Sequence, residues 1–230
     1  MFINIVIPAR NGSKGIKNKN LAKVGNVPLF ERSINHAIEL SKYFSLKIWL
    51  STDIPSLLNY QSDFKDLVIC KRDKNLCGDE VLTYDVILNL INSYSIPEEE
   101  FLVLFQPTTP FRDLLEVRDA IIFLEENYYF KSLVSLSDVG GNHPFRMKKI
   151  NKEGEIFDFT DQGYENMIPR QSLPKVYIRS GSFYISRVSS ILKNGTLLPK
   201  PCKGVIHNEY KYAINIDSEV DLILANNFNI

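Results

Sequence analysis

The chain has 230 residues, of which 44% are hydrophobic and 23% charged, a composition typical of a folded globular protein rather than of a disordered or fibrous one. Its 27 lysines and arginines balance its 27 aspartates and glutamates, so the overall charge favours neither nucleic acid nor an anionic membrane surface as a partner. No apolar run approaches the ~18 residues of a membrane span, and the N-terminus lacks a signal-peptide pattern. We therefore expect a cytoplasmic protein without nucleic-acid or membrane partners, whose three cysteines are reduced thiols.

The first half of the sequence alternates short apolar runs with longer amphipathic ones. Residues 2–8, FINIVIP, predict a strand buried on both faces, since nearly all of them are apolar. Residues 28–44 predict a helix, because their apolar positions recur at helical spacing and Pro28 suits a first turn. Asp79 is the expected N-cap of a second helix. The same patterns predict further strands at 46–51, 67–70 and 101–105, and helices at 79–91 and 114–127.

The second half contains a segment in which this alternation stops. After a predicted strand at 132–137, residues 138–176 combine glycine turns with short candidate strands around 145–150 and 155–159. We interpret this segment as a subdomain inserted into a single domain that comprises residues 1–230. The chain then continues with predicted strands at 181–186, 203–207 and 212–217, a short helix near 187–193 and a last helix from Ser218.

Strands that alternate with helices predict an α/β fold with a mostly parallel sheet, helices on both of its faces and right-handed crossovers. Ligands of such sheets bind at the carboxyl ends of the strands. The residues that directly follow each predicted strand are therefore the first candidates for a functional site.

The segment after the first strand, ARNGSKGIKNKN, is rich in glycine and in positive charge. No Asp or Glu occurs from Met1 to Phe30. The pattern fits neither the P-loop nor GxGxxG, yet glycines that let the backbone approach a ligand, together with several cations, suit a polyphosphate. The alternative is a solvated basic loop. The residues concerned are Arg10, Gly12, Lys14, Gly15, Lys17 and Lys19.

Two further segments follow predicted strands. In LFQPTTPFR, Gln106 offers a donor and an acceptor for sugar hydroxyls or a carboxylate, and a plain turn is the alternative. In INIDSEVDL, Asp217 ends a predicted strand directly before Ser218, the expected N-cap of the last helix. The Asp217 carboxylate is a candidate ligand for Mg²⁺ that bridges phosphate oxygens, and an ordinary capping acid is the alternative.

Motifs in the order IPARNGSKGIKNKNL, RDKNLCGDEVLTYDVI, LFQPTTPFR, PRQSLPKVYIRSGSFYI and NIDSEVDL resemble those of the CMP-acylneuraminate synthetase (acylneuraminate cytidylyltransferase) family. The resemblance extends over nearly the whole chain. It implies a Rossmann-like α/β nucleotidyltransferase that works as a homodimer through an inserted dimerisation subdomain. The implied reaction uses CTP and Mg²⁺ to activate a nonulosonic acid, such as sialic or legionaminic acid, and gives the CMP-sugar and pyrophosphate.

The resemblance also assigns roles to individual residues. The implied catalytic residues are Arg10, Lys19 and Asp217, and the implied metal ligands are Asp217 and Asn215. The nucleotide-binding positions are Arg10, Asn11, Gly12, Ser13, Lys19, Asn20, Arg72 and Thr83. The sugar-binding positions are Gln106, Arg146, Arg170 and Tyr184, and the two arginines are expected to reach toward the sugar across the dimer. From the residues alone, Tyr184 suits the core as well as a sugar face, and arginines of this kind are usually solvated.

One departure from the family pattern bears on the sugar. Sialic acid synthetases commonly carry Asp-x-Asp at the metal site, whereas this chain has Asn215-Ile216-Asp217. The departure favours a nonulosonic acid other than sialic acid. Two alternatives stay open. One is a nucleotidyltransferase for another acid sugar, such as 3-deoxy-manno-octulosonate, or for a sugar 1-phosphate, and the other is a non-catalytic nucleotide- or sugar-binding module that has lost metal binding at Asn215.

Overall fold

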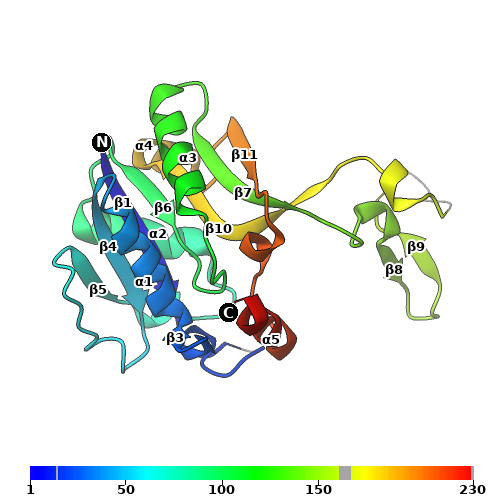
Figure 1. The fold of residues 1–230 in the computed structure, drawn as a ribbon, viewed down its shortest axis with the longest axis horizontal. Coiled ribbons are helices and arrows are strands. Elements are labelled where there is room, and N and C mark those ends of the chain that lie inside the picture. Colours follow the sequence, from blue (N-terminus) through cyan, green and yellow to red (C-terminus); the bar gives the residue numbers. More distant parts are fainter. Residues whose placement is uncertain (14, 161–166, 229–230) are drawn as a thin grey trace.

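The computed structural model describes residues 1–13, 15–160 and 167–228, and its centre is a seven-stranded sheet (Figure 1). In spatial order the strands are β11 (Cys202–Ile206), β7 (Ser132–Asp138), β10 (Tyr177–Arg187), β6 (Phe101–Leu104), β1 (Phe2–Ala9), β4 (Ser45–Thr52) and β5 (Leu67–Lys71). β10 is antiparallel to both of its neighbours, and the other neighbouring pairs are parallel. The predicted α/β fold with a mostly parallel sheet is confirmed.

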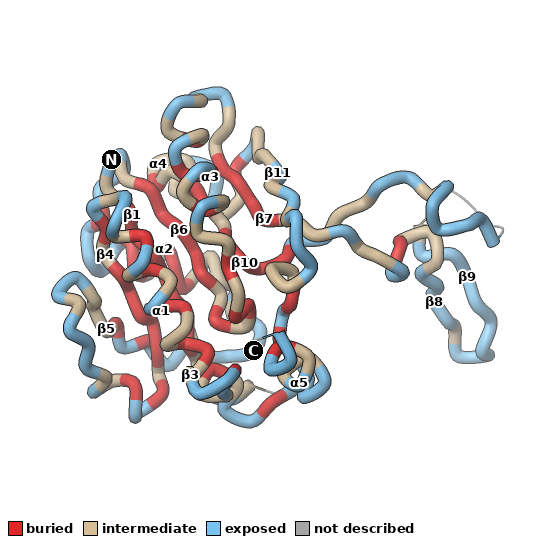
Figure 2. The backbone as a smooth tube through the Cα atoms, viewed as in Figure 1, coloured by how far each residue is buried: buried red, intermediate tan, exposed pale blue. Residues whose placement is uncertain are grey.

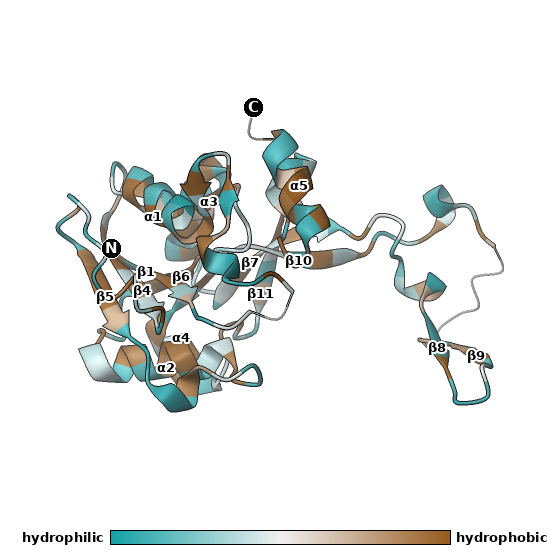
Figure 3. Cartoon of the chain, turned by 90° about the horizontal axis from the view of Figure 1, so that it is seen from below, coloured by the Kyte–Doolittle hydropathy of each residue, from teal (hydrophilic) through white to brown (hydrophobic). Residues whose placement is uncertain are grey.

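Helices cover both faces of this sheet, as predicted (Figure 3). α1 (Leu29–Leu40) and α3 (Leu114–Glu126) pack on one face. α2 (Thr83–Tyr94) and α4 (Val188–Asn194) pack on the other. Within the part of the chain that the structure describes, no helix combines the length and the apolar character needed to span a lipid bilayer.

Strand β1 is apolar on both sides because it lies between the two helical layers. Its side chains alternate, so that Ile3, Ile5 and Ile7 pack with α1 and α3, whereas Val6 packs with α2 and α4. Asn4 is buried, and its Oδ1 accepts a hydrogen bond from the Trp49 indole N–H at 2.9 Å. A strand enclosed in this way gives a fixed base to the loop that follows it.

A third apolar cluster holds together the segments at the carboxyl ends of the strands. It joins the loop after β1 and the hairpin of β2 (Lys23–Val24) and β3 (Val27–Pro28) to α5 (Glu219–Phe228). The Ile216 N–H also donates to the Thr108 carbonyl at 2.8 Å, which places the segment before α5 beside the loop after β6. The buried members of the cluster are Ile16, Val24, Leu29, Ile214, Ile216 and Ala225.

The N-terminus of α2 differs from the prediction. The helix begins at Thr83, and Leu82 occupies the cap position with extended backbone, so Asp79 is not the N-cap. The carboxylate of Asp79 instead pairs with Arg10 across the sheet edge. Residues 79–82 therefore belong to the loop that precedes the helix, because a tertiary ion pair uses the side chain that a local cap would need.

The strand predicted at 212–217 is also wrong. Residues Tyr210–Ala213 form a 3₁₀ turn, and the residues after them are not part of the sheet. Ile214 and Ile216 do point inward in alternation, which is the pattern that suggested a strand. They pack into the third apolar cluster rather than against the sheet, and this explains the error.

The described residues of 139–176, which we call the arm, stand away from the sheet (Figure 1) and are largely exposed (Figure 2). The arm carries the antiparallel hairpin of β8 (Lys148–Ile150) and β9 (Ile156–Asp158), within the ranges predicted for short strands. β7 and β10 flank the arm in sequence and pair directly with each other. The described part of the arm therefore adds no strand to the central sheet.

His36 on α1 makes stability depend on pH. Burial, together with the Arg112 and Arg32 guanidinium groups, lowers the pKa of His36 to about 3. Its Nδ1 lies 3.3 Å from Arg112 Nη1, the contact expected of a neutral ring. The unfolded chain protonates this side chain below ~6.5, whereas the folded chain does not, so stability falls as the pH drops from ~6.5 toward about 3.

We expect His36→Gln to remove this part of the pH dependence. The free energy of unfolding, measured by urea titration, should drop less in the variant than in the unmodified protein between about pH 7 and about pH 5, by on the order of 1–2 kcal/mol. The same pH dependence in both proteins would contradict the assignment of a neutral, buried His36.

Candidate active site

A cleft of about 520 Å³ opens at the carboxyl ends of the central strands, where ligands of α/β sheets bind. Its walls are the loops after β1 and β6, the loop before α2 and the segment before α5. The cleft brings together the following predicted residues: Arg10, Ser13, Lys19, Asn20, Arg72, Thr83, Gln106 and Asp217. It is also lined by residues that the sequence reasoning did not assign to a site, namely Pro8, Leu76, Gly78, Asp79, Val81, Val86 and Pro107.

The described residues of the basic loop, residues 9–20, are held by hydrogen bonds within the loop and to Asp53, which directly follows β4. Asn20 Nδ2 donates to the Arg10 carbonyl at 2.8 Å. The Asn11 N–H donates to Asp53 Oδ1 at 2.7 Å, and Asn11 Oδ1 accepts from the Gly12 N–H at 2.9 Å. Gly12 has a φ of +74°, which glycine adopts without Cβ strain. Asn11 and Gly12 thus shape the loop and do not themselves line the cleft.

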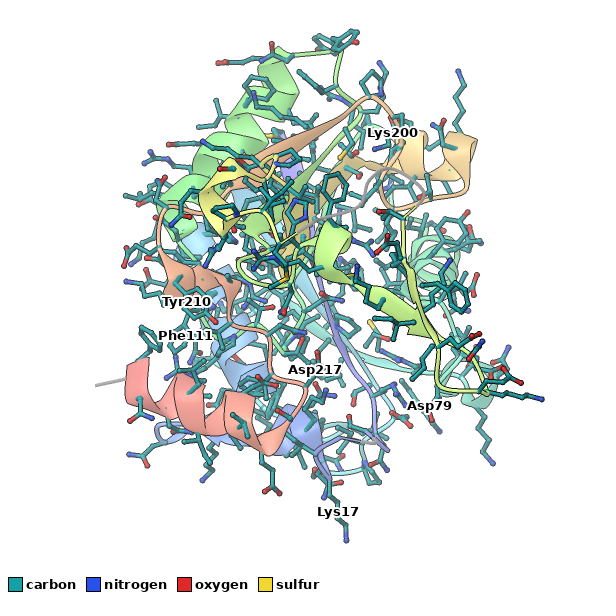
Figure 4. The ribbon with its side chains drawn as sticks, turned by 90° about the vertical axis from the view of Figure 1, so that its right-hand side faces the viewer. Lys17, Asp79, Phe111, Lys200, Tyr210 and Asp217 are labelled. Atoms are coloured by element: carbon teal, nitrogen blue, oxygen red, sulfur yellow. The ribbon has the colours of Figure 1, made fainter. Side chains whose placement is uncertain are left out.

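Two cations of the basic loop each pair with a carboxylate from another wall of the cleft. Arg10 Nη2 lies 2.6 Å from Asp79 Oδ1, and Lys19 Nζ lies 2.8 Å from Asp217 Oδ1. Figure 4 shows that Asp79 and Asp217 come from different elements of the chain. Phosphate oxygens could take the place of these carboxylate oxygens, because both are acceptors for charge-assisted hydrogen bonds.

The remaining basic residues differ in position. Lys17 points into solvent (Figure 4), and Lys14 lies outside the described residues. Arg72 is buried directly after β5 and donates to the Ser51 hydroxyl and carbonyl at 3.3 and 3.1 Å. Burial lowers the pKa of Arg72, and the Asp53 carboxylate acts in the opposite direction. A cation fixed by such bonds forms part of the inner wall of the cleft.

Gln106 is held against β10 on another side of the cleft. Gly181 has a φ of +83°, and a Cβ at this position would come within 2.7 Å of Gln106 Oε1 and 2.9 Å of Thr109 Oγ1. Tyr184 Oη donates to Gln106 Oε1 at 3.5 Å. Burial raises the pKa of the Tyr184 phenol, which keeps it a donor. The structure thus places the two predicted sugar contacts, Gln106 and Tyr184, next to each other.

Arg112 fixes the backbone beneath Gln106. Its Nη2 donates to the Gln106 carbonyl at 2.6 Å, and its Nε donates to the Ser182 carbonyl at 2.7 Å. The guanidinium group also stacks 4.4 Å from the centre of the Phe105 ring, and burial lowers the pKa of Arg112 to about 9. Asp113 is the cap of α3, and Arg112 is a support for the site that lies inside the protein.

Asp217 presents a carboxylate to solvent at the mouth of the cleft, with 66% of its side chain exposed. Asn215 Nδ2 donates to Asp217 Oδ2 at 2.6 Å and does not line the cleft. Among the described residues, no three His, Cys, Asp or Glu side chains form a group that could hold a metal ion. An exposed carboxylate beside a cleft for phosphates nevertheless fits a hard cation that keeps several waters.

The segment after Asp217 is fixed by the N-cap predicted at Ser218. Ser218 donates to Asp221 Oδ2 through its N–H and its hydroxyl, both at 2.8 Å, and the Asp221 N–H returns a bond to Ser218 Oγ at 3.4 Å. Burial alone would raise the pKa of Asp221, but these bonds and the nearby Lys19 lower it. Ser218 therefore caps α5 together with Asp221 in its first turn, and Asp217 is not needed as a cap.

The two predicted arginines of the arm do not line the cleft. Arg146 Nη2 donates to the Ile168 carbonyl at 3.0 Å within the arm. Arg170 Nη2 lies 3.7 Å from Asp138 Oδ1, where the arm leaves β7. A role for either arginine at the sugar of the same chain is not supported by their position.

The comparison with protein families agrees with this site. A family model described as cytidylyltransferase matches residues 4–184. The chain belongs to the cytidylyltransferase family. The matched residues include β1, the basic loop, Gln106, the arm and most of β10, so the family pattern covers three walls of the cleft.

The relatives of this chain include enzymes whose names specify a sugar. An N-acylneuraminate cytidylyltransferase of Streptococcus agalactiae is 28% identical over 95% of this chain and 51% of its own length. A CMP-N,N′-diacetyllegionaminic acid synthase of Legionella pneumophila is 28% identical over 98% of this chain and 95% of its own length. The chain therefore spans about half the length of the streptococcal relatives and nearly all of the Legionella one.

Solved structures share the fold at lower identity. A CMP:2-keto-3-deoxy-manno-octonic acid synthetase complexed with CTP superposes with a TM-score of 0.68 at 14% identity, over 100% of this chain and 98% of the other. A 4-diphosphocytidyl-2C-methyl-D-erythritol synthase from Anaerococcus prevotii gives a TM-score of 0.60 at 18% identity, over 99% and 96%. They show that this chain shares the fold of these two structures.

Gly15 lies where the basic loop closely approaches the segment before α5. A Cβ at this position would lie 2.2 Å from the Asp217 carbonyl oxygen, a backbone atom that cannot rotate away. We expect Gly15→Ala to separate the two walls and to weaken CTP binding by about tenfold or more, because the ligand groups lose their common geometry.

Isothermal titration calorimetry measures this effect, and thermal unfolding shows whether the variant is folded. Gly141→Ala is the matched control, since its added methyl group meets no atom within 4 Å and its backbone is not in the left-handed region. Normal CTP affinity in folded Gly15→Ala would show that contact between the two walls is not required.

Proposed function

We propose that this cytidylyltransferase transfers CMP from CTP to a nonulosonic acid and releases pyrophosphate. The names of the relatives support this reaction, with N-acylneuraminate in one and diacetyllegionaminic acid in another. The geometry supports it through a cleft at the strand ends that has cations on one wall and a polar, aromatic pair, Gln106 and Tyr184, near another.

The observation that carries the proposal is the position of Arg10 and Lys19 in one cleft, each facing a carboxylate that phosphate oxygens can displace. In the proposed reaction, the anomeric hydroxyl of the sugar attacks the α-phosphorus of CTP. The new O–P bond forms as the bond to the β-phosphate oxygen breaks, and the hydroxyl proton passes to solvent. Arg10 and Lys19 stabilise the charge that develops on the phosphate oxygens as pyrophosphate leaves.

Asp217 is the residue that we assign to Mg²⁺, and Asn215 is the proposed second ligand through its amide oxygen. The Asp217 carboxylate is exposed and lies beside Lys19, so it would hold a hard cation of this kind. A bound ion would supply positive charge near the leaving pyrophosphate. Asn215 brings an oxygen without a charge, which leaves a site with one carboxylate.

We assign the carboxylate of the sugar to Arg170 and Arg146 from a second copy of the chain. Neither residue lines the cleft of its own chain, and a guanidinium group suits a bidentate carboxylate. The arm also exposes apolar side chains, among them Ile150 with 71% of its area accessible, and such surfaces favour contact with another protein. The further exposed apolar residues on or beside the described part of the arm are Met147, Ile156, Phe157, Phe159, Met167, Ile168 and Ile178. A homodimer formed through the arm would bring the two arginines to the cleft of the partner and would cover the exposed apolar side chains.

A legionaminic-type sugar is the substrate that we favour within the class. The Legionella relative matches nearly the whole of both chains, and Asn215 departs from the Asp-x-Asp of sialic acid synthetases. The likeness to the octonic acid synthetase concerns the fold, so 3-deoxy-manno-octulosonate is the second candidate. The three cysteines are free, which suits the reducing cytoplasm where we place the enzyme.

The direct test is pyrophosphate release with CTP and Mg²⁺ against sialic, legionaminic and pseudaminic acids and 3-deoxy-manno-octulosonate. Release with one nonulosonic acid supports the proposed reaction and identifies the sugar. Release with 3-deoxy-manno-octulosonate alone supports the second candidate. CTP binding without release for every sugar would overturn the proposal in favour of a non-catalytic nucleotide-binding module.

Lys19→Ala should lower turnover by about two orders of magnitude while the protein stays folded, as expected when one group that stabilises transition-state charge is lost. Lys17→Ala is the matched control, because Lys17 belongs to the same loop but points into solvent (Figure 4). Both variants are assayed by steady-state pyrophosphate release. A Lys19→Ala rate equal to that of Lys17→Ala would remove Lys19 from the proposed mechanism.

Mixing two inactive variants tests the assignment of Arg170 to the site of the other chain. If each site combines the core of one chain with the arm of its partner, a heterodimer of Lys19→Ala and Arg170→Ala contains one intact site. Equal amounts that exchange freely should then regain about a quarter of the unmodified activity by statistics alone. Each variant by itself stays inactive in this assay. No recovery after exchange, confirmed by native mass spectrometry, would place Arg170 at the site of its own chain or outside the site.

A further inference from the structure

A buried chain of hydrogen bonds runs from α3 to β10 and is not part of the cleft. His207, directly after β11, has 1% of its side chain exposed and contacts Glu116 Oε2 through Nδ1 at 2.6 Å. Its other ring nitrogen, Nε2, lies 2.8 Å from Ser180 Oγ. Ser180 Oγ in turn lies 2.7 Å from Ser135 Oγ on β7. Three elements of the fold thus meet in one polar network inside the protein.

The direction of these bonds follows from counting protons. Ser135 donates its single hydroxyl proton to the Phe183 carbonyl at 3.0 Å, so the Ser180 proton is the one that lies between the two hydroxyls. Ser180 Oγ therefore faces His207 as an acceptor, and Nε2 carries the proton of that contact. In the second contact the Glu116 carboxylate can only accept, so Nδ1 donates to Oε2 at 2.6 Å and both ring nitrogens carry a proton, which fixes the orientation of the ring.

The network fixes the irregular part of β10. The register of β10 against β7 shifts between Arg179 and Tyr184, so the backbone there lacks regular sheet partners. Ser135 Oγ satisfies both the N–H and the carbonyl of Phe183, and Ser180 Oγ accepts from the Ser182 N–H at 3.3 Å. These bonds replace the missing sheet bonds, which buried backbone groups require.

Gly181 lies at the centre of this irregular stretch and abuts Gln106. The gap at Gly181 is so small that a Cβ would clash with Gln106 Oε1 at 2.7 Å. The Thr109 hydroxyl also donates to the Ser180 carbonyl at 3.4 Å. A shift of Ser180 or Gly181 is therefore transmitted to the loop that carries Gln106. The described residues of the basic loop make no hydrogen bond or ion pair with either residue.

We propose that His207 is a positioning residue for the sugar side of the cleft: by donating from Nε2 to Ser180, with Glu116 holding its other nitrogen, it sets the place of Gly181 and thereby of Gln106. This deepens the proposed function, on which the kinetic part of its test rests. The order Ser180–His207–Glu116 matches that of a hydrolase triad, but here the serine proton is used by Ser135, and Ser180 is buried and does not line the cleft. The network supports the backbone of β10, and Ser180 does not act as a nucleophile.

The kinetic test compares His207→Asn, His207→Gln and Ser180→Ala. The shorter Asn amide cannot reach Ser180, whereas the Gln amide can place a donor near the former Nε2. We expect the KM for the sugar acid to rise about tenfold in His207→Asn and in Ser180→Ala, which corresponds to ~1.4 kcal/mol. The KM for CTP should stay within about twofold, since one hydrogen bond on the sugar side is lost. His207→Gln should recover most of the sugar affinity.

Val205→Ala is the control for a general loss of stability. Val205 lies on β11, two positions before His207, and packs on the main core without joining the network. It should lower the melting temperature and leave the KM for the sugar unchanged. A rise in both KM values together, or the same rise in sugar KM for Val205→Ala, would reduce His207 to an ordinary structural residue and overturn the proposal.

A readout independent of turnover separates this proposal from the proposed function. The side-chain amide resonances of Gln106 in ¹H–¹⁵N spectra of the free protein should shift in His207→Asn and Ser180→Ala but not in Val205→Ala. If the unmodified protein turns over no sugar, the reaction assigned above fails, and these spectra still decide the positioning role. Unchanged Gln106 resonances in both network variants would overturn it whatever the protein catalyses.

Discussion

The approach of the basic loop to the Asp217 segment is the constraint on which the site depends. Lys19 and Asp217 are separated by 198 positions in the sequence, yet their side chains meet at 2.8 Å. Two features allow this contact: Gly15 has no side chain where the Asp217 carbonyl passes, and the third apolar cluster buries Ile16 from one segment and Ile216 from the other. The apolar contact supplies stability, and the glycine determines how closely the polar groups of the two walls can face each other.

The sequence was sufficient for those parts of the fold that depend on local pattern. The side chains of β1 point alternately toward two helical layers, and the apolar sequence of this segment correctly predicted a strand covered on both faces. The boundary of α2 and the segment before α5 were misread, because Asp79 is used in a tertiary ion pair and Ile214 and Ile216 pack on a loop. In both cases a contact distant in sequence overrode a local signal that was itself real.

The same distinction holds at the site. Residues carried by a motif, such as Arg10, Lys19 and Gln106, were predicted and do line the cleft. Residues that act by supporting others carried no such signal: Arg112 lay within a recognised motif but its burial and its bonds to Gln106 depend on folding, and His207 stood alone in the sequence. For Gly15 and Gly181 the sequence did offer one indication, because a glycine beside a predicted site often marks a close approach of two backbone segments. It does not indicate which segment approaches.

The polar side chains that form and support the cleft include two kinds that differ in how easily they can exchange partners. The Arg10–Asp79 pair is partly exposed, and the Lys19–Asp217 pair has an exposed carboxylate, so each pairing contributes little, on the order of 0–1 kcal/mol. A triphosphate can therefore take both cations from their carboxylates at small cost. Arg112 and His207 are buried and hold several backbone and hydroxyl partners, and losing one such partner leaves an unsatisfied polar group, at a cost of ~1–3 kcal/mol. The wall that would receive the phosphates therefore carries cations whose partners can be exchanged. The wall that carries Gln106 is held in a single arrangement. This difference suits a site in which one substrate is recognised by its charge and the other by its shape.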